Sequence, residues 1–90
     1  MSLDKQTIFE IVRANTLKVL PDLLPDDITI DKSLTELGAN SVDRVEVVLY
    51  SVEELKLKVP TSELHGIRNL RALVDLLYRY ASEETAWRQY

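Results

Sequence analysis

The amino-acid sequence predicts an all-α fold: a four-helix bundle with three longer helices, one short helix and a long first crossover loop. Apolar residues recur at helical spacing in three separate segments of the chain. Prolines and two glycines divide these segments from one another. No segment has a pattern that predicts a strand of a sheet.

The first predicted helix covers residues 4–20, and Pro21 ends it. Two polar residues, Asn15 and Thr16, interrupt its apolar face and weaken the periodicity. The apolar residues that we expect to face the core are Ile8, Ile11, Val12, Val19 and Leu20.

A long connection follows, from Pro21 to Asn40. Ile28 and Ile30 alternate with polar residues, so we expect both side chains to tuck under the bundle. The sequence Ser33-Leu34-Thr35-Glu36 matches a capping box, in which the first and last side chains bind each other's backbone N–H groups. It predicts one helical turn that ends at Gly38, a residue suited to a left-handed backbone conformation.

The second helix has the clearest pattern in the chain. Asn40 is a good N-cap, and Asp43 follows in the first turn, where the helix dipole favours an anion. We therefore predict an amphipathic helix of about four turns, which ends before Val59 and Pro60. The apolar stripe that we expect to face inward consists of Val42, Val45, Val48 or Leu49, Val52 and Leu55.

The last third of the chain predicts one short and one long helix. Ser62-Glu63-Leu64 favours a short helical turn after Pro60. Asn69 is suited to cap the final helix, and residues 81–90 are expected to extend that helix or to form a flexible tail. Residues 1–90 are thus expected to form a single domain. The residues of the final helix predicted to face inward are Leu70, Leu73, Val74 and Leu77.

Composition excludes several classes of function. A net charge of −4 argues against a nucleic-acid-binding protein. No apolar run approaches the roughly 20 residues that a membrane span needs. The N-terminus lacks the apolar stretch of a signal peptide, so the cytoplasm is the expected location. The absence of cysteine excludes disulfides, cysteine-based metal sites and any side-chain thiol.

Ser41 is the candidate functional residue. It begins the second predicted helix, where backbone N–H groups and the helix dipole would favour an attached phosphodiester. Two interpretations remain open from the local residues: a polar residue that only caps the helix, or a hydroxyl modified by another protein. Catalysis by Ser41 is disfavoured, because His65 is the only histidine and no third group is placed to orient it. No metal site is predicted either.

The segment from Leu37 to Glu46 resembles the phosphopantetheine-attachment motif of acyl carrier proteins. That motif is commonly written L-G-x-D-S-L, followed by a helix with D-x-V-E. This chain has Leu37-Gly38-Ala39-Asn40-Ser41-Val42 and then Asp43-Arg44-Val45-Glu46. The resemblance continues through later features of the family and covers almost the whole chain. These features are Glu53-Glu54-Leu55, Val59-Pro60 and Asn69-Leu70.

The resemblance implies that the chain is a carrier and not an enzyme. A phosphopantetheinyl transferase would attach 4′-phosphopantetheine from coenzyme A to Ser41, and the thiol of this arm would hold acyl groups as thioesters. The inward stripe of the second helix would line a cleft for the acyl chain. Acyltransferase and ketosynthase-type enzymes are the implied partners, and the chain is expected to be a monomer.

The run from Asn40 to Glu46 looks most similar to stand-alone carriers of polyketide pathways. In particular, it resembles the donor carrier of β-branching cassettes, which brings an acetyl group to an enzyme like 3-hydroxy-3-methylglutaryl (HMG) synthase. A fatty-acid carrier, a peptidyl carrier and a carrier-like adaptor without the arm remain as alternatives.

The resemblance also implies that the second helix docks partner enzymes. Asn40 replaces the usual aspartate of the family, either by neutral drift or with loss of a charge beside the phosphate. Arg44 is explained either by an exposed ion pair with Asp43 or Glu46 or by selection between partners. Val47 and Tyr50 lie off the inward stripe and would add an apolar spot. The predicted docking residues are Asn40, Val42, Asp43, Arg44, Glu46, Val47 and Tyr50.

Overall fold

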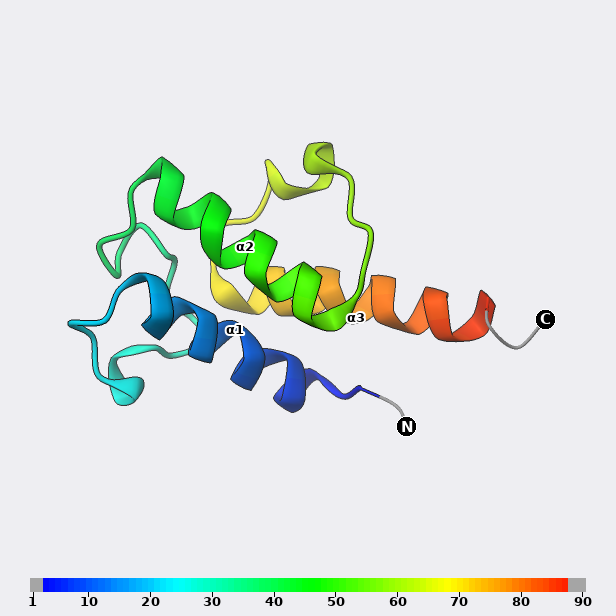
Figure 1. The fold of residues 1–90 in the computed structure, drawn as a ribbon, viewed down its shortest axis with the longest axis horizontal. Coiled ribbons are helices and arrows are strands. Elements are labelled where there is room, and N and C mark those ends of the chain that lie inside the picture. The colour runs from blue at the N-terminus through cyan, green and yellow to red at the C-terminus, as the bar shows by residue number, and fades with distance from the viewer. Residues whose placement is uncertain (1–2, 88–90) are drawn as a thin grey trace.

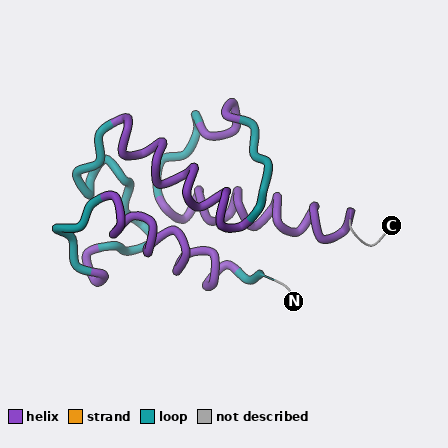
Figure 2. The backbone as a smooth tube through the Cα atoms, in the orientation of Figure 1, coloured by secondary structure: helices purple, strands orange, loops and turns teal. Residues whose placement is uncertain are grey.

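A computed structural model describes residues 3–87 of the chain, with side chains up to residue 83. The described part is all-helical and measures 44 × 26 × 19 Å. Two long loops join its helices, and α3 extends beyond the other two (Figures 1 and 2). Its elements, in order, are α1 (Lys5–Val19), the 3₁₀ turn η1 (Pro25–Asp27), α2 (Ser41–Leu55), the 3₁₀ turn η2 (Thr61–Leu64) and α3 (Leu70–Trp87).

The all-helical class is confirmed, but the predicted fourth helix is only the 3₁₀ turn η2. This segment begins after Pro60, and its Glu63 N–H donates to the Pro60 carbonyl at 3.0 Å. This i→i+3 hydrogen bond is typical of a 3₁₀ helix, which rarely continues beyond three or four residues. The predicted extension after residue 80 is helical through Trp87. The rest of that prediction, residues 88–90, lies outside the described residues.

α1 begins at Lys5, one residue after the predicted start, because Asp4 caps it: the Asp4 carboxylate accepts the Thr7 N–H at 2.8 Å. The expectation that Asn15 and Thr16 interrupt the core face is wrong, since both side chains are buried. Thr16 Oγ1 donates to the Val12 carbonyl at 2.8 Å. Burial costs these polar groups little when each has a hydrogen-bond partner.

The core lies where α1 packs against both α2 and α3. The inward face predicted for the final helix is confirmed, and Asn69 caps that helix by accepting the Ala72 N–H at 2.9 Å. Ile28 of the first loop is also buried, as predicted. The core residues with the least exposure are Ile8, Val12, Ile28, Val47, Leu70, Leu73, Val74 and Leu77.

The face that α2 turns toward the core differs from the predicted stripe. Its fully buried residues are Val47 and Ser51, whereas Val42, Val45 and Leu49 are 64%, 56% and 47% exposed. The other predicted residues, Val48, Val52 and Leu55, are partly buried against the core. α2 carries apolar residues on more than one side, so its contact with α1 decides which side is buried.

The second half of the first loop is held by hydrogen bonds. Ser33 and Glu36 exchange the two predicted capping-box hydrogen bonds, at 3.0 and 3.1 Å, and Gly38 adopts a φ of +100°. The Leu37 N–H donates to the Ser33 carbonyl at 3.2 Å, so the segment forms the single helical turn that the sequence predicts, with Gly38 at its end. The Leu70 N–H donates to the Lys32 carbonyl at 2.8 Å, which ties the loop to the start of α3.

Candidate functional site

Ser41 is the first residue of α2, and its side chain is exposed. Asn40 caps the helix: its Oδ1 accepts the Asp43 N–H at 2.8 Å, and Asp43 Oδ2 accepts the Asn40 N–H at 3.2 Å. Gly38 turns the chain just before this cap. The capping role that the sequence left open for Ser41 therefore belongs to Asn40, and the Ser41 side chain stays exposed.

Arg44 reaches back over the start of α2. Its Nη2 donates to Ser41 Oγ at 3.4 Å, and its Nη1 donates to Thr35 Oγ1 at 3.1 Å. Of the two explanations for Arg44, the ion pair with Asp43 or Glu46 is not formed, because neither carboxylate lies within 4.0 Å of the guanidinium. Arg44 instead connects the turn of the first loop to the candidate attachment residue. No pattern along the chain indicates the contact with Thr35.

A cavity of about 630 Å³ opens beside Ser41. α1 makes the extensive contacts with both α2 and α3, which leaves space between those two helices on the side of η2. Ser41 and Arg44 border this space, and no carboxylate of the described residues lines it. Val45, Val48 and Leu49 of the predicted stripe line this cavity, whereas Val42, Val52 and Leu55 do not. Its apolar lining residues are Leu34, Val45, Val48, Leu49, Leu64, Ile67, Leu70 and Leu73.

The η2 segment, which forms part of the cavity wall, is fastened to α3. Tyr80 donates its hydroxyl to Glu63 Oε2 at 2.6 Å, and Arg79 forms an ion pair with the same carboxylate. The Tyr80 hydrogen bond, together with the Arg79 charge, lowers the pKa of Glu63 below its ordinary value, and the same hydrogen bond raises the pKa of Tyr80. No pattern in the sequence predicted this contact, because the partners lie 16 and 17 residues apart.

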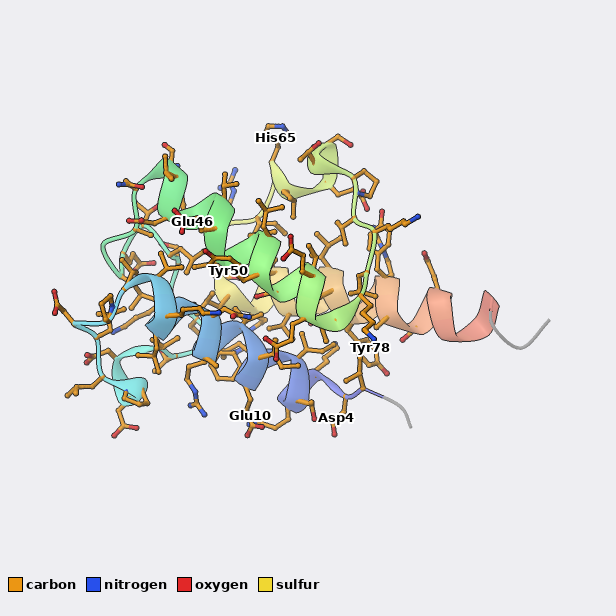
Figure 3. All side chains as sticks on the ribbon, viewed as in Figure 1. Asp4, Glu10, Glu46, Tyr50, His65 and Tyr78 are labelled. Atoms are coloured by element: carbon orange, nitrogen blue, oxygen red, sulfur yellow. The ribbon has the colours of Figure 1, made fainter. Side chains whose placement is uncertain are left out.

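The predicted docking residues on α2 are not all accessible. Val42 is exposed, and Glu46 lies 3.5 Å from the Tyr50 hydroxyl on the face shown in Figure 3. The Tyr50 ring lies beneath Lys18 Nζ, 4.9 Å away. Val47 is fully buried, so its predicted docking role is wrong. It occupies the side of α2 that packs into the core.

His65 lies outside this docking face. It follows η2, borders the cavity and projects outward at the top of Figure 3. Among the described residues, no group of three or more acidic, histidine or cysteine side chains could hold a metal ion. None of the described helices is long and apolar enough to span a membrane.

A family model described as the phosphopantetheine attachment site matches residues 10–77. The chain belongs to this family of carrier proteins. Its prosthetic group is accordingly 4′-phosphopantetheine, and its relatives are acyl carrier proteins, which are carriers and not catalysts. The sulfur that the cysteine-free chain lacks is thus supplied by the prosthetic group.

Several relatives of this carrier protein have names that state their role. Polyketide biosynthesis acyl-carrier-protein AcpK of Bacillus subtilis is 43% identical over 84% of this chain and 93% of the relative. An acyl carrier protein of Clostridium perfringens is 31% identical over 67% of this chain and 75% of the relative. Chloroplastic acyl carrier protein 1 of Hordeum vulgare is 31% identical over 74% of this chain and 44% of the relative.

A solved structure also matches this carrier protein. It is a chain from the crystal structure of the curacin biosynthetic pathway HMG synthase in complex with acetyl donor-ACP. The TM-score is 0.79 at 31% sequence identity, and the match covers 86% of this chain and 99% of the other. The arrangement of α1, α2 and α3 is thus found in another structure whose sequence is related.

Proposed function

We propose that this protein is an acyl carrier protein of a polyketide pathway, with its 4′-phosphopantetheine arm attached to Ser41. The observation that carries the proposal is an exposed serine hydroxyl at the start of α2, beside an apolar cavity. Asn40 performs the capping, so esterification of Ser41 would cost no cap hydrogen bond. The 43% identity to a polyketide carrier supports the pathway.

The residues around Ser41 fit the arm. The exposed hydroxyl leaves a transferase room to approach, and the helix start favours a phosphodiester. When bound, the arm would supply a thiol that holds acyl groups as thioesters. The cavity lining, with Val45, Val48 and Leu49 on one wall, suits an apolar acyl chain.

We further propose that the carried group is acetyl and that an HMG synthase-like enzyme receives it. The structural match to a chain of an HMG synthase complex with acetyl donor-ACP supports this partner. A phosphopantetheinyl transferase, an acyltransferase and ketosynthase-type enzymes complete the proposed set of partners. A monomeric state and a cytoplasmic location stay as predictions from the sequence.

The exposed part of α2 is the proposed docking face for these enzymes. Val42 would provide an apolar contact, and the carboxylate of Glu46 would attract a basic partner surface. Asp43 and Asn40 also hold each other through the cap, so their mutation would change the helix start as well as the face. Tyr50, next to Glu46, would form the far end of the face.

Loading in vitro tests the attachment residue. The purified apo-protein would be incubated with coenzyme A and a broad-specificity phosphopantetheinyl transferase, then analysed by intact mass and peptide mapping. We expect a single addition on Ser41, its loss in Ser41→Ala and its retention in Ser62→Ala, which changes an exposed serine outside the site. An addition elsewhere, or none with several transferases, would overturn the proposal.

Transfer to a partner tests the acetyl assignment. The acetyl-loaded protein would be offered to a β-branching HMG synthase and, in parallel, to a fatty-acid ketosynthase. Faster acetyl transfer to the synthase supports the assignment. Preference for the fatty-acid enzyme, or loading with amino acids by an adenylating enzyme, would instead indicate a fatty-acid or a peptidyl carrier. Normal function of Ser41→Ala in the host would indicate an adaptor without the arm.

A further inference from the structure

We propose that Arg44 binds the phosphate of the arm and fixes the direction in which the arm leaves Ser41. The inference rests on the proposed attachment at Ser41. It gives Arg44 a positioning role toward the prosthetic group of its own chain, in place of the exposed ion pair that the sequence suggested.

The position of the guanidinium is the first support. Arg44 Nη2 lies 3.4 Å from Ser41 Oγ, the atom that would become the ester oxygen. Arg44 Nη1 is held by Thr35 Oγ1 at 3.1 Å. Thr35 belongs to the turn that Ser33 and Glu36 close with two hydrogen bonds, so the anchor of the guanidinium is itself fixed. A group esterified to Ser41 would therefore begin beside a restrained cation.

The charge of Arg44 is the second support. Arg71 and Arg79 form ion pairs with Asp31 and Glu63, whereas no carboxylate of the described residues lies within 4.0 Å of Arg44. Its two hydrogen bonds go to neutral hydroxyl groups. A phosphodiester carries the anionic oxygens that a guanidinium fork binds best.

The place of Arg44 along the helix is the third support. A cation in the first turn of an α-helix is unfavourable, because the dipole there is positive. Asn40 is neutral, and the Asp43 carboxylate accepts the Asn40 N–H and forms no ion pair with Arg44. An anionic group on Ser41 would remove the unfavourable interaction. Arg44 also borders the cavity, so a phosphate held by Arg44 would start the arm along that opening.

Phosphorus and arginine NMR of the loaded protein test the proposal. Wild type, Arg44→Gln, Arg44→Lys and Arg68→Gln would be loaded with the arm, and intact mass would establish loading before the spectra are recorded. Arg68 is the matched control, because it borders the same cavity without a hydrogen bond to Ser41. A protein that gains no mass would refute the proposed function, whereas a loaded protein tests Arg44 alone.

We expect the ³¹P resonance of the arm to shift in Arg44→Gln, to shift less in Arg44→Lys and to stay near its wild-type position in Arg68→Gln. In wild type, the side-chain N–H resonances of Arg44 should move on loading more than those of Arg68. Equal ³¹P positions in wild type and Arg44→Gln would overturn the inference. Equal shifts in Arg44→Gln and Arg68→Gln would also overturn it, since they would indicate a distant effect of charge.

Discussion

α2 has apolar residues on two sides, but they are buried on the side toward α1 and about half exposed on the side toward η2. Toward α1, Val47 is fully buried and Ser51 accepts a hydrogen bond from Asn15 Nδ2 at 3.3 Å. Toward η2, Val45 and Leu49 are about half exposed and line the cavity. Val45 and Leu49 therefore contribute less to stability than Val47 does, because about half of their surface stays in contact with solvent.

A matched pair of truncations should give the largest effect. Leu77→Ala removes a fully buried side chain of α3 and should lower the free energy of unfolding by about 2–5 kcal/mol. Leu49→Ala, on the cavity side, should cost less than about 1 kcal/mol. Urea unfolding followed by circular dichroism measures both. Equal losses of unfolding free energy in the two variants would mean that the cavity wall is as tightly packed as the core. That result would contradict the difference between the two sides of α2.

Backbone conformation, and not burial, should govern stability next to the site. Gly38→Ala should destabilise the protein by about 1–2 kcal/mol, because alanine is strained at a φ of +100°. Apart from the two neighbouring residues, the new methyl group would meet no atom within 4 Å, so the cost comes from the backbone conformation. Gly66→Ala is the control: its site is open and its φ is not positive, so its expected effect is neutral or slightly stabilising. A tolerated Gly38→Ala would contradict the account of this turn.

The smallest expected effect is the pH dependence of the contact that fastens η2. Folding lowers the pKa of Glu63 below its ordinary value of 4.5. The contact with Tyr80 and Arg79 therefore stabilises the folded protein fully above pH 4.5, and this stabilisation is lost as the pH falls through the lowered pKa. Tyr80→Phe removes the hydrogen bond that is the main cause of the lowered pKa. The unfolding free energy of this variant should therefore decline less than that of wild type between neutral and acid pH. Tyr78→Phe is the control, because the Tyr78 hydroxyl makes no hydrogen bond among the described residues. Identical pH profiles for Tyr80→Phe and wild type would refute this role.

Local chemistry made the helix starts predictable. Asn40 and Asn69 each cap the helix that the sequence assigned to them. The stripe on the final helix was also predictable, because Leu70, Leu73, Val74 and Leu77 recur at helical spacing, and all four are buried. The motif that includes Ser41, together with the helix spacing and Pro60, indicated the family, and the match over residues 10–77 confirms it.

The packed face of α2 could not be predicted in the same way. Apolar residues surround that helix, and the face that packs includes the polar Ser51 opposite Asn15. Hydropathy assigns such polar residues to the surface, so Val47 was placed on the wrong side. The contact of Arg44 with Thr35 and the pairing of Glu63 with Tyr80 depend on tertiary structure, which spacing along the chain does not contain.

The mass of the protein purified from its native host tests the central claim most directly. Fragmentation of the peptide that contains Ser41 would locate any added group. We expect a phosphopantetheine mass on Ser41 in most molecules, with part of them carrying an acyl thioester. A functional protein whose mass equals that of its unmodified amino-acid chain would contradict the account.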